Sequence, residues 1–212
     1  MKEFLSPGRY IDSDHPVVVA FAREHAQGAG ELERAVALYY AVRDAVRYNP
    51  FLDFSQDRAF RASACLEAGE GFCIGKAALL AACARAAGIP ARVGFADVKN
   101  HLTTPRLAER MGSDLFIYHG FSELFLEGKW VKATPAFNLD LCRKFRVRPL
   151  EFDGRADSIF HPFDEDERRH MEYLRDRGSF ADVPAREIQQ AFREAYPALY
   201  QLGRDAAKET FG

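Results

Sequence analysis

Apolar residues recur at helical spacing in the first quarter of the chain. Residues 31–50 read ELERAVALYYAVRDAVRYNP, and the segment closes at an Asn-Pro pair. Intervals of three and four residues place the apolar side chains on one face of a helix. The preceding segment, SDHPVVVAFAREHAQG, has a proline in its first turn and a glycine after its end, so it is predicted as a shorter helix. The apolar positions of the longer helix are Leu32, Val36, Tyr39, Val42 and Val46.

The most uniformly apolar segment is residues 73–87, CIGKAALLAACARAA. It is rich in alanine and leucine, the strongest helix formers, and Gly88 and Pro90 follow it as stop signals. Because it is apolar all round, this helix is expected to lie at the centre of the fold. Residues 51–71 mix aromatic and charged positions without a sustained period and are predicted as a loop with a short helical turn.

Strand patterns follow the central helix. ARVGFADV is predicted as a buried strand, and LFIYHGFSELFLEGKWVKATPAF as two strands joined by a tight turn at Glu127 and Gly128. Beyond residue 140 the chain is charged and aromatic without a clear period, which indicates an ordered loop.

Two helices are predicted in the last part of the chain. One spans about 165–177, and the other begins near Pro184, capped by Asp182 and bent at Pro197. We therefore expect a core of residues 1–139 with a mainly helical C-terminal extension, residues 140–212, packed on it.

Composition argues against two classes of partner, nucleic acid and anionic membranes. The 212 residues are 48% hydrophobic, enough for a core of ordinary size, and 29 Lys and Arg balance 31 Asp and Glu. This balance gives no reason to expect nucleic acid or an anionic membrane as partner. The first residues lack the apolar run of a secretory signal, and no stretch approaches the roughly 20 apolar residues of a membrane span, so a cytoplasmic protein is expected.

The four cysteines show no paired C-x-x-C motif and no disulfide-dense spacing, which argues against zinc and against structural bridges. Free thiols in a reducing compartment are expected instead. Three of them, Cys65, Cys83 and Cys142, are assigned to packing.

Cys73 stands at the predicted start of the central helix. Unpaired N–H groups and the positive end of the helix dipole favour a thiolate there, which would lower the pKa of the thiol, and the same donors suit an oxyanion. Gly71 and Gly75 would let a substrate backbone approach the sulfur, and Tyr48 is a further candidate for substrate binding.

A thiol nucleophile needs a proton carrier, usually histidine. Of the six histidines, His119 lies within a predicted strand and is followed by Gly120, which leaves space beside it. A two-residue turn at residues 127–128 makes Thr134 a diagonal neighbour of His119, roughly 7–8 Å away between backbones. A group at position 134 could orient the imidazole.

Two segments resemble the transglutaminase-like superfamily. GFCIGKAALLAACARAAGIPARV is similar to its cysteine segment, and YHGFSELFLEGKWVKATP resembles its histidine and aspartate hairpin. The similarity runs from about Val46 to Phe137 and includes the eleven-residue step from His119 to Trp130. It implies a papain-like α+β fold in which a central cysteine-bearing helix packs on an antiparallel β-sheet.

The resemblance also implies residue roles. Cys73 takes the position of the nucleophile and His119 that of the base, while the family's aspartate position holds Thr134. A hydroxyl can accept the imidazole N–H but brings no negative charge to stabilise the imidazolium. Asn138 and Asp140, just past the hairpin, are alternative partners for the ring.

The leading hypothesis is a thiol enzyme that acts on amide or ester carbonyls through a Cys73 thioester, as a hydrolase or an acyl transferase. Its substrate would be a peptide, a protein or a small amide or ester, with no cofactor and no metal. The alternative is a catalytically degenerate member that binds a peptide or protein, which Thr134 supports. An acyl-CoA-dependent transferase like the arylamine acetyltransferases is less favoured, because their characteristic segments are not visible. The sequence does not indicate an oligomeric state.

Overall fold

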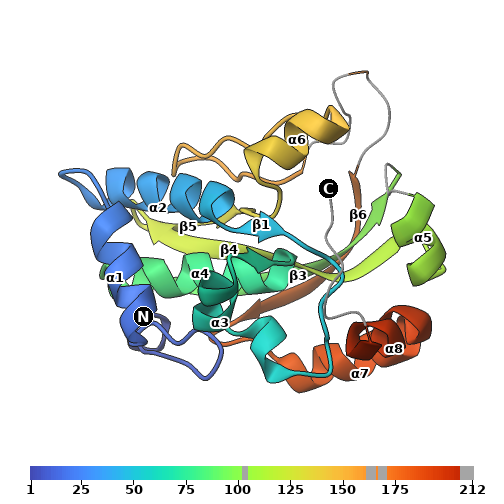
Figure 1. The fold of residues 1–212 in the computed structure, drawn as a ribbon. Coiled ribbons are helices and arrows are strands. Elements are labelled where there is room, and N and C mark those ends of the chain that lie inside the picture. Colours follow the sequence, from blue (N-terminus) through green and yellow to red (C-terminus); the bar gives the residue numbers. More distant parts are fainter. Residues whose placement is uncertain (102–104, 161–165, 167–170, 206–212) are drawn as a thin grey trace.

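A four-stranded antiparallel sheet and one long buried helix form the centre of the molecule (Figure 1). The structure is a computed structural model that describes residues 1–101, 105–160, 166 and 171–205. The order of the strands in the sheet is β5-β4-β3-β6. Their bounds are β3 (Ala91–Asn100), β4 (Leu115–Leu126), β5 (Lys129–Ala133) and β6 (Met171–Phe180).

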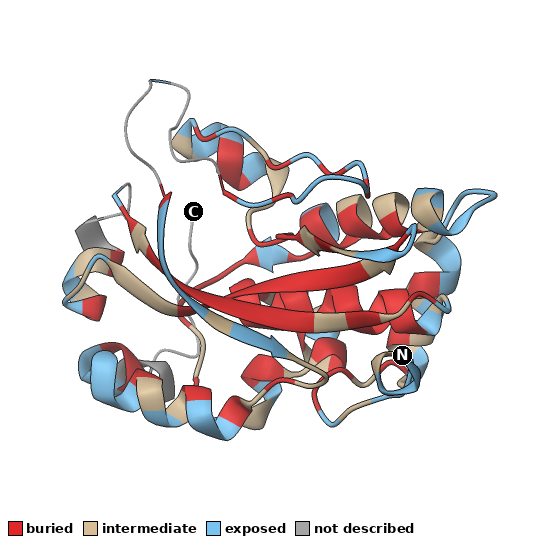
Figure 2. Cartoon of the chain, turned by 180° about the vertical axis from the view of Figure 1, so that it is seen from behind, coloured by how far each residue is buried: buried red, intermediate tan, exposed pale blue. Residues whose placement is uncertain are grey.

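The central helix is α4 (Cys73–Ala86), in which every residue from Cys73 to Arg85 is buried. It packs on β3 and β4 on one side, and three helices pack against it elsewhere. Seen from behind, the buried residues concentrate on α4, β3 and β4, whereas β6 is largely exposed (Figure 2). The predicted central helix and the antiparallel sheet are thus confirmed. The three covering helices are α1 (Pro16–His25), α2 (Glu31–Ala45) and α3 (Ala62–Ala68).

Shorter elements complete the described part of the chain. The strands β1 and β2 form a separate parallel pair just ahead of α4, and α5, α7 and α8 lie near the end of the sheet where β4 begins (Figure 1). The bounds are η1 (Lys2–Phe4), β1 (Arg47–Tyr48), η2 (Asp57–Phe60), β2 (Glu70–Gly71), α5 (Pro105–Met111), α6 (Leu139–Phe145), α7 (Ala185–Ala195) and α8 (Pro197–Asp205).

The hairpin of β4 and β5 has the predicted turn. Glu127 and Gly128 both have positive φ, 48° and 85°, as a two-residue type I′ turn requires. The register starts with Leu126 opposite Lys129 and runs to Ser122 opposite Ala133. The hairpin prediction is therefore confirmed in position and register.

A buried lysine ties α4 to its neighbour. Lys76 is fully buried, and its Nζ donates to the carbonyl oxygens of Arg43, at 2.8 Å, and Val46 at the end of α2. Burial lowers the pKa of Lys76 to about 7, because the ammonium loses its hydration. These bonds satisfy carbonyls at a helix end and fix the first turns of α4 against α2.

The helix predicted over 165–177 is wrong. Residues 171–180 form β6, which pairs with the edge of β3 from Asn100 opposite Met171 to Val93 opposite Phe180. Glu, Leu and Arg are good helix formers, but helix propensity is a small effect, and pairing with a distant strand overrides it. Residues 165 and 167–170 of the predicted helix lie outside the described residues.

Other differences are smaller. Helices α3 and α6 form where mainly loop was predicted, and the last predicted helix is two helices, α7 and α8, that separate at Tyr196 before Pro197. Asp182 does not cap α7. Its carboxylate instead accepts the backbone N–H groups of Arg9 and Ile11, at 2.7 and 2.9 Å.

The division into residues 1–139 and 140–212 stays a prediction. The structure adds that the second part supplies β6, an edge strand of the same sheet that holds β3, β4 and β5. The C-terminal segment therefore completes the sheet as well as adding helices to it.

Candidate active site

The first turn of α4 lies directly against β4. Cys73 is the first residue of α4, and a Cβ added at Gly120 would stand 2.9 Å from Cα of Ile74. Real Cβ atoms do not approach a backbone atom that closely, so glycine at position 120 allows the contact. The contact places the strand that carries His119 beside the sulfur of Cys73.

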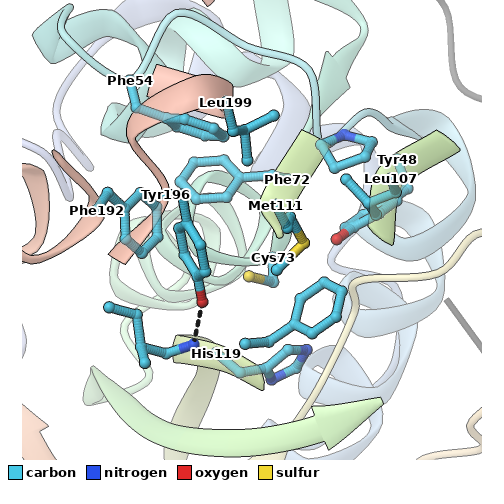
Figure 3. Close-up of a pocket in the computed structure, with 13 residues that line it drawn as sticks. Tyr48, Phe54, Phe72, Cys73, Leu107, Met111, His119, Phe192, Tyr196 and Leu199 are labelled. Carbon is cyan, nitrogen blue, oxygen red and sulfur yellow. Dashed lines mark hydrogen bonds between the residues drawn. The ribbon is translucent and has the colours of Figure 1, made fainter. Parts of the chain in front are cut away.

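Cys73 and His119 line one pocket (Figure 3). The side chain of Tyr48, from β1, lines the same pocket. Cys73 is 7% exposed and His119 is 3% exposed, so both side chains are almost entirely buried. The structure therefore brings three of the candidate residues from sequence, Cys73, His119 and Tyr48, to one place.

A β-bulge lies next to His119 in β4. The pairing of β3 with β4 shifts register between Ala96 and Val98, and Tyr118, opposite this shift, has a φ of 52°. Positive φ is uncommon for a bulky residue, and bulges often re-aim side chains next to active sites. The ring of His119 packs edge-on against Phe160, with 5.1 Å between the ring centroids.

An ion pair supports the bulge. Asp97 is buried, and its carboxylate accepts the backbone N–H of Tyr118 at 3.1 Å. The same carboxylate accepts two bonds from the guanidinium of Arg177 on β6, at 2.6 and 2.8 Å. Bidentate Arg–carboxylate bonds are geometrically specific, so this pair fixes the backbone next to His119.

The expectation of a lowered thiol pKa is wrong. Burial raises the pKa of Cys73 to about 11, because a thiolate would lose its hydration. The backbone N–H groups of Gly120 and Ile74 favour the thiolate but offset only part of this cost. At neutral pH the resting site therefore holds a thiol, and its proton must leave during the reaction.

The alkylation rate of Cys73 tests this protonation state. The thiolate is the nucleophile, so the rate with iodoacetamide should rise about tenfold per pH unit from pH 7 to 10. Mass spectrometry of the Cys73 peptide measures it, and Cys65, whose pKa burial raises to about 12, serves as the internal control. A plateau below pH 8 would show that the thiol is already ionised.

The third position of the site has a different environment from the one expected. Thr134 is 1% exposed, and its Oγ1 has no hydrogen-bond partner among the described residues. Asn138 accepts the backbone N–H of Tyr48 at 3.1 Å, and Asp140 is exposed and pairs with Arg143. Neither of the two substitutes is among the described residues that line the pocket.

The two glycines near Cys73 pack closely against neighbouring residues, and a role in substrate access stays a prediction. A Cβ at Gly71 would lie 2.4 Å from Sγ of Cys65, and one at Gly75 would lie 3.1 Å from the carbonyl oxygen of Ala59. Both positions face the segment ahead of α4, and neither is among the described residues that line the pocket.

All four cysteines are free and buried. Within the described ranges there is no group of three or more His, Cys, Asp or Glu side chains that could hold a metal ion. No helix in the described part of the chain is long and apolar enough to cross a membrane.

Most residues of the pocket wall were not predicted from the sequence. Phe116 and Ile117 of β4, Met111 of α5, and Phe192 and Tyr196 from the C-terminal region all line it. These apolar residues have the same pattern as core residues, so no signal in the sequence separates the two roles.

A family model for the transglutaminase-like superfamily matches residues 19–135, more than half of the chain. A search of curated proteins found no match to this chain. Two solved structures are similar to parts of it. One is a "putative cysteine protease" from Cytophaga hutchinsonii, with 20% identity and a TM-score of 0.48, covering 84% of this chain and 52% of its own. The other is a "putative protease" from Parabacteroides distasonis, with 16% identity and a TM-score of 0.41. The match covers 59% of this chain and 25% of that protein. This chain thus spans about half of the first structure's length and a quarter of the second's.

Proposed function

Because the chain belongs to the transglutaminase-like superfamily, we propose that it is a thiol enzyme that acts on amide or ester carbonyls through a thioester at Cys73. The observation that carries the proposal is the shared pocket, in which Cys73 begins a buried helix and His119 lines the same space. A nucleophile and a base within reach of one reacting atom are the basic requirement for acyl transfer.

The reaction begins with proton transfer. His119 takes the thiol proton of Cys73 as the sulfur attacks the carbonyl carbon, which forms a C–S bond and a tetrahedral oxyanion. Free backbone N–H groups at the start of α4 stabilise that oxyanion. The oxyanion collapses, the C–N or C–O bond breaks, and the departing amine or alcohol takes the proton from His119.

Resolution of the thioester returns the enzyme to its first state. Water or a second amine attacks the acyl carbon, and His119 accepts the proton of the attacking group. The C–S bond then breaks, and the sulfur of Cys73 recovers its proton from His119. Hydrolysis and transfer differ only in the attacking group, and the substrate we propose is a peptide, a protein or a small amide or ester.

The raised thiol pKa supports this order of events. A thiol with a pKa of about 11 is a poor nucleophile at pH 7, so attack requires a base that acts in the same step. The cysteines form no disulfide in the described part of the structure, which fits a reducing compartment, and we propose the cytoplasm as the location.

The alternative is a binding module without turnover. Thr134 favours it, since its buried hydroxyl makes no hydrogen bond in the described part of the structure and carries no charge for an imidazolium. Such a protein would hold a peptide or protein in the cleft, and its affinity would not depend on the sulfur.

Intact-mass spectrometry separates the two functions. Incubation with p-nitrophenyl butyrate at pH 8 should add one butyryl group, and peptide mapping should place it on Cys73. Cys83→Ala, a variant at a buried cysteine in the same helix, should acylate as the wild type does. No adduct at any time while ester remains, together with ester loss no faster than in buffer, or an adduct on other residues, would contradict the enzyme and favour the binding module.

A further inference from the structure

We infer that the pocket beside Cys73 selects short, uncharged aliphatic acyl groups, and that the C-terminal helices α7 and α8 set this limit. The inference rests on the proposed thioester chemistry and adds the substrate class. It is carried by the lining of the pocket, by its volume, and by the origin of one wall.

The lining is almost entirely hydrocarbon. Aromatic rings, aliphatic side chains and a methionine surround the sulfur (Figure 3). Apart from Cys73, His119 and two tyrosine hydroxyls, the side chains of the described lining residues carry no hydrogen-bonding group. The residues that matter most for the argument are Phe54, Phe72, Leu107, Met111, Phe192 and Leu199.

The hydroxyl of Tyr196 is already used. The oxygen of Tyr196 accepts the backbone N–H of Ile117 at 2.7 Å and donates to the carbonyl oxygen of Leu115 at 2.6 Å. Tyr196 is buried, so its ring forms wall and its hydroxyl faces β4 (Figure 3). A polar or charged acyl group would lose its water here with few compensating hydrogen bonds, which disfavours its binding.

The volume limits the length of the acyl group. The pocket holds about 40 Å³ of free space. An apolar cavity that admits benzene is about 150 Å³, so an aromatic acyl group does not fit without movement of the walls. A chain of two to four carbons is the class that suits both the size and the apolar lining.

One wall comes from outside the matched family segment. Phe192 of α7 and Leu199 of α8 lie beyond residues 19–135. Phe192 packs on Phe54 and Phe72, with 5.3 and 6.4 Å between ring centroids, so α7 is seated on the start of α4. The selectivity is thus a property of this chain's own C-terminal helices.

The test measures acylation rates with p-nitrophenyl esters of two, four and eight carbons, from the burst of p-nitrophenolate. Each acyl group passes from the ester oxygen to the sulfur of Cys73, and p-nitrophenolate leaves. The wild-type protein should acylate at least tenfold faster with butyrate than with octanoate. It should also react at least tenfold faster with butyrate than with the succinate half-ester, whose four-carbon acyl group ends in a carboxylate, after the spontaneous intramolecular release of p-nitrophenolate from that ester is subtracted.

Variants of the wall identify its role. Leu199→Ala should raise the ratio of the octanoate to the butyrate acylation rate at least tenfold. Phe192→Leu, which replaces a buried ring by a smaller apolar side chain, should also raise this ratio. Leu174→Ala, at an exposed position of β6, is the matched control and should leave the ratio unchanged.

Equal rates for all esters, or wall variants that leave the ratio unchanged, would overturn the selectivity and leave the thioester chemistry intact. Absence of acylation with every ester would instead overturn the proposed function, and the selectivity with it.

Discussion

Replacing Cys73 by alanine is expected to lower the rate of p-nitrophenyl butyrate turnover at pH 8 by at least about 10³-fold, because the covalent route is lost. The residual rate should equal that of the ester in buffer with an inert protein. Steady-state release of p-nitrophenolate measures the effect, and the butyryl adduct should disappear from the intact mass.

Cys83→Ala is the control for this variant. Cys83 is buried in the same helix, ten residues further along the chain, so its replacement makes a comparable change in the packing of α4. Its turnover should stay within about threefold of the wild-type rate, since a small buried truncation changes stability more than chemistry. Equal turnover by the wild type and the Cys73→Ala variant would remove the basis for a thiol enzyme.

Replacing His119 by alanine should lower turnover at pH 7 by about 10²- to 10⁴-fold, the range typical of a lost general base. The defect should shrink as the pH rises toward 10. The pKa of Cys73 is about 11, so the thiolate fraction increases with pH and the need for a base declines. Rate profiles of both proteins between pH 7 and 10 measure this convergence.

His25→Ala, on α1 and away from the described pocket lining, controls for the loss of an imidazole. It should follow the wild-type profile at every pH. A His119→Ala defect of the same size at pH 7 and pH 10 would indicate damage to the pocket instead of a missing proton acceptor.

Much of this site's framework follows from local patterns. The Ala-rich segment after Cys73 forms the central helix because it is apolar on all sides. Glu127 and Gly128 form the two-residue turn because both adopt the positive φ that such a turn requires. Both features depend on neighbours in the sequence, so pattern and spacing are sufficient to predict them. The register that carries Thr134 past the end of β5 then follows from the turn.

The parts that could not be predicted depend on distant contacts. Residues 171–180 become a strand only because β3 offers a free edge, and Asp182 is occupied by the backbone of Arg9 and Ile11 rather than by α7. The pKa of Cys73 likewise depends on how completely α7, α8 and β4 remove water from the sulfur. The position of Cys73 at the start of a helix would by itself lower this pKa, whereas burial raises it.

The proposed chemistry requires Cys73 and His119 to lie close together, and a crystal structure of the acylation-competent protein would show whether they do. We expect Sγ of Cys73 within about 4 Å of an imidazole nitrogen of His119, or linked to it through one water, with an open path to the sulfur. A separation beyond about 6 Å with no bridging water, or a sulfur sealed from solvent on every side, would contradict it.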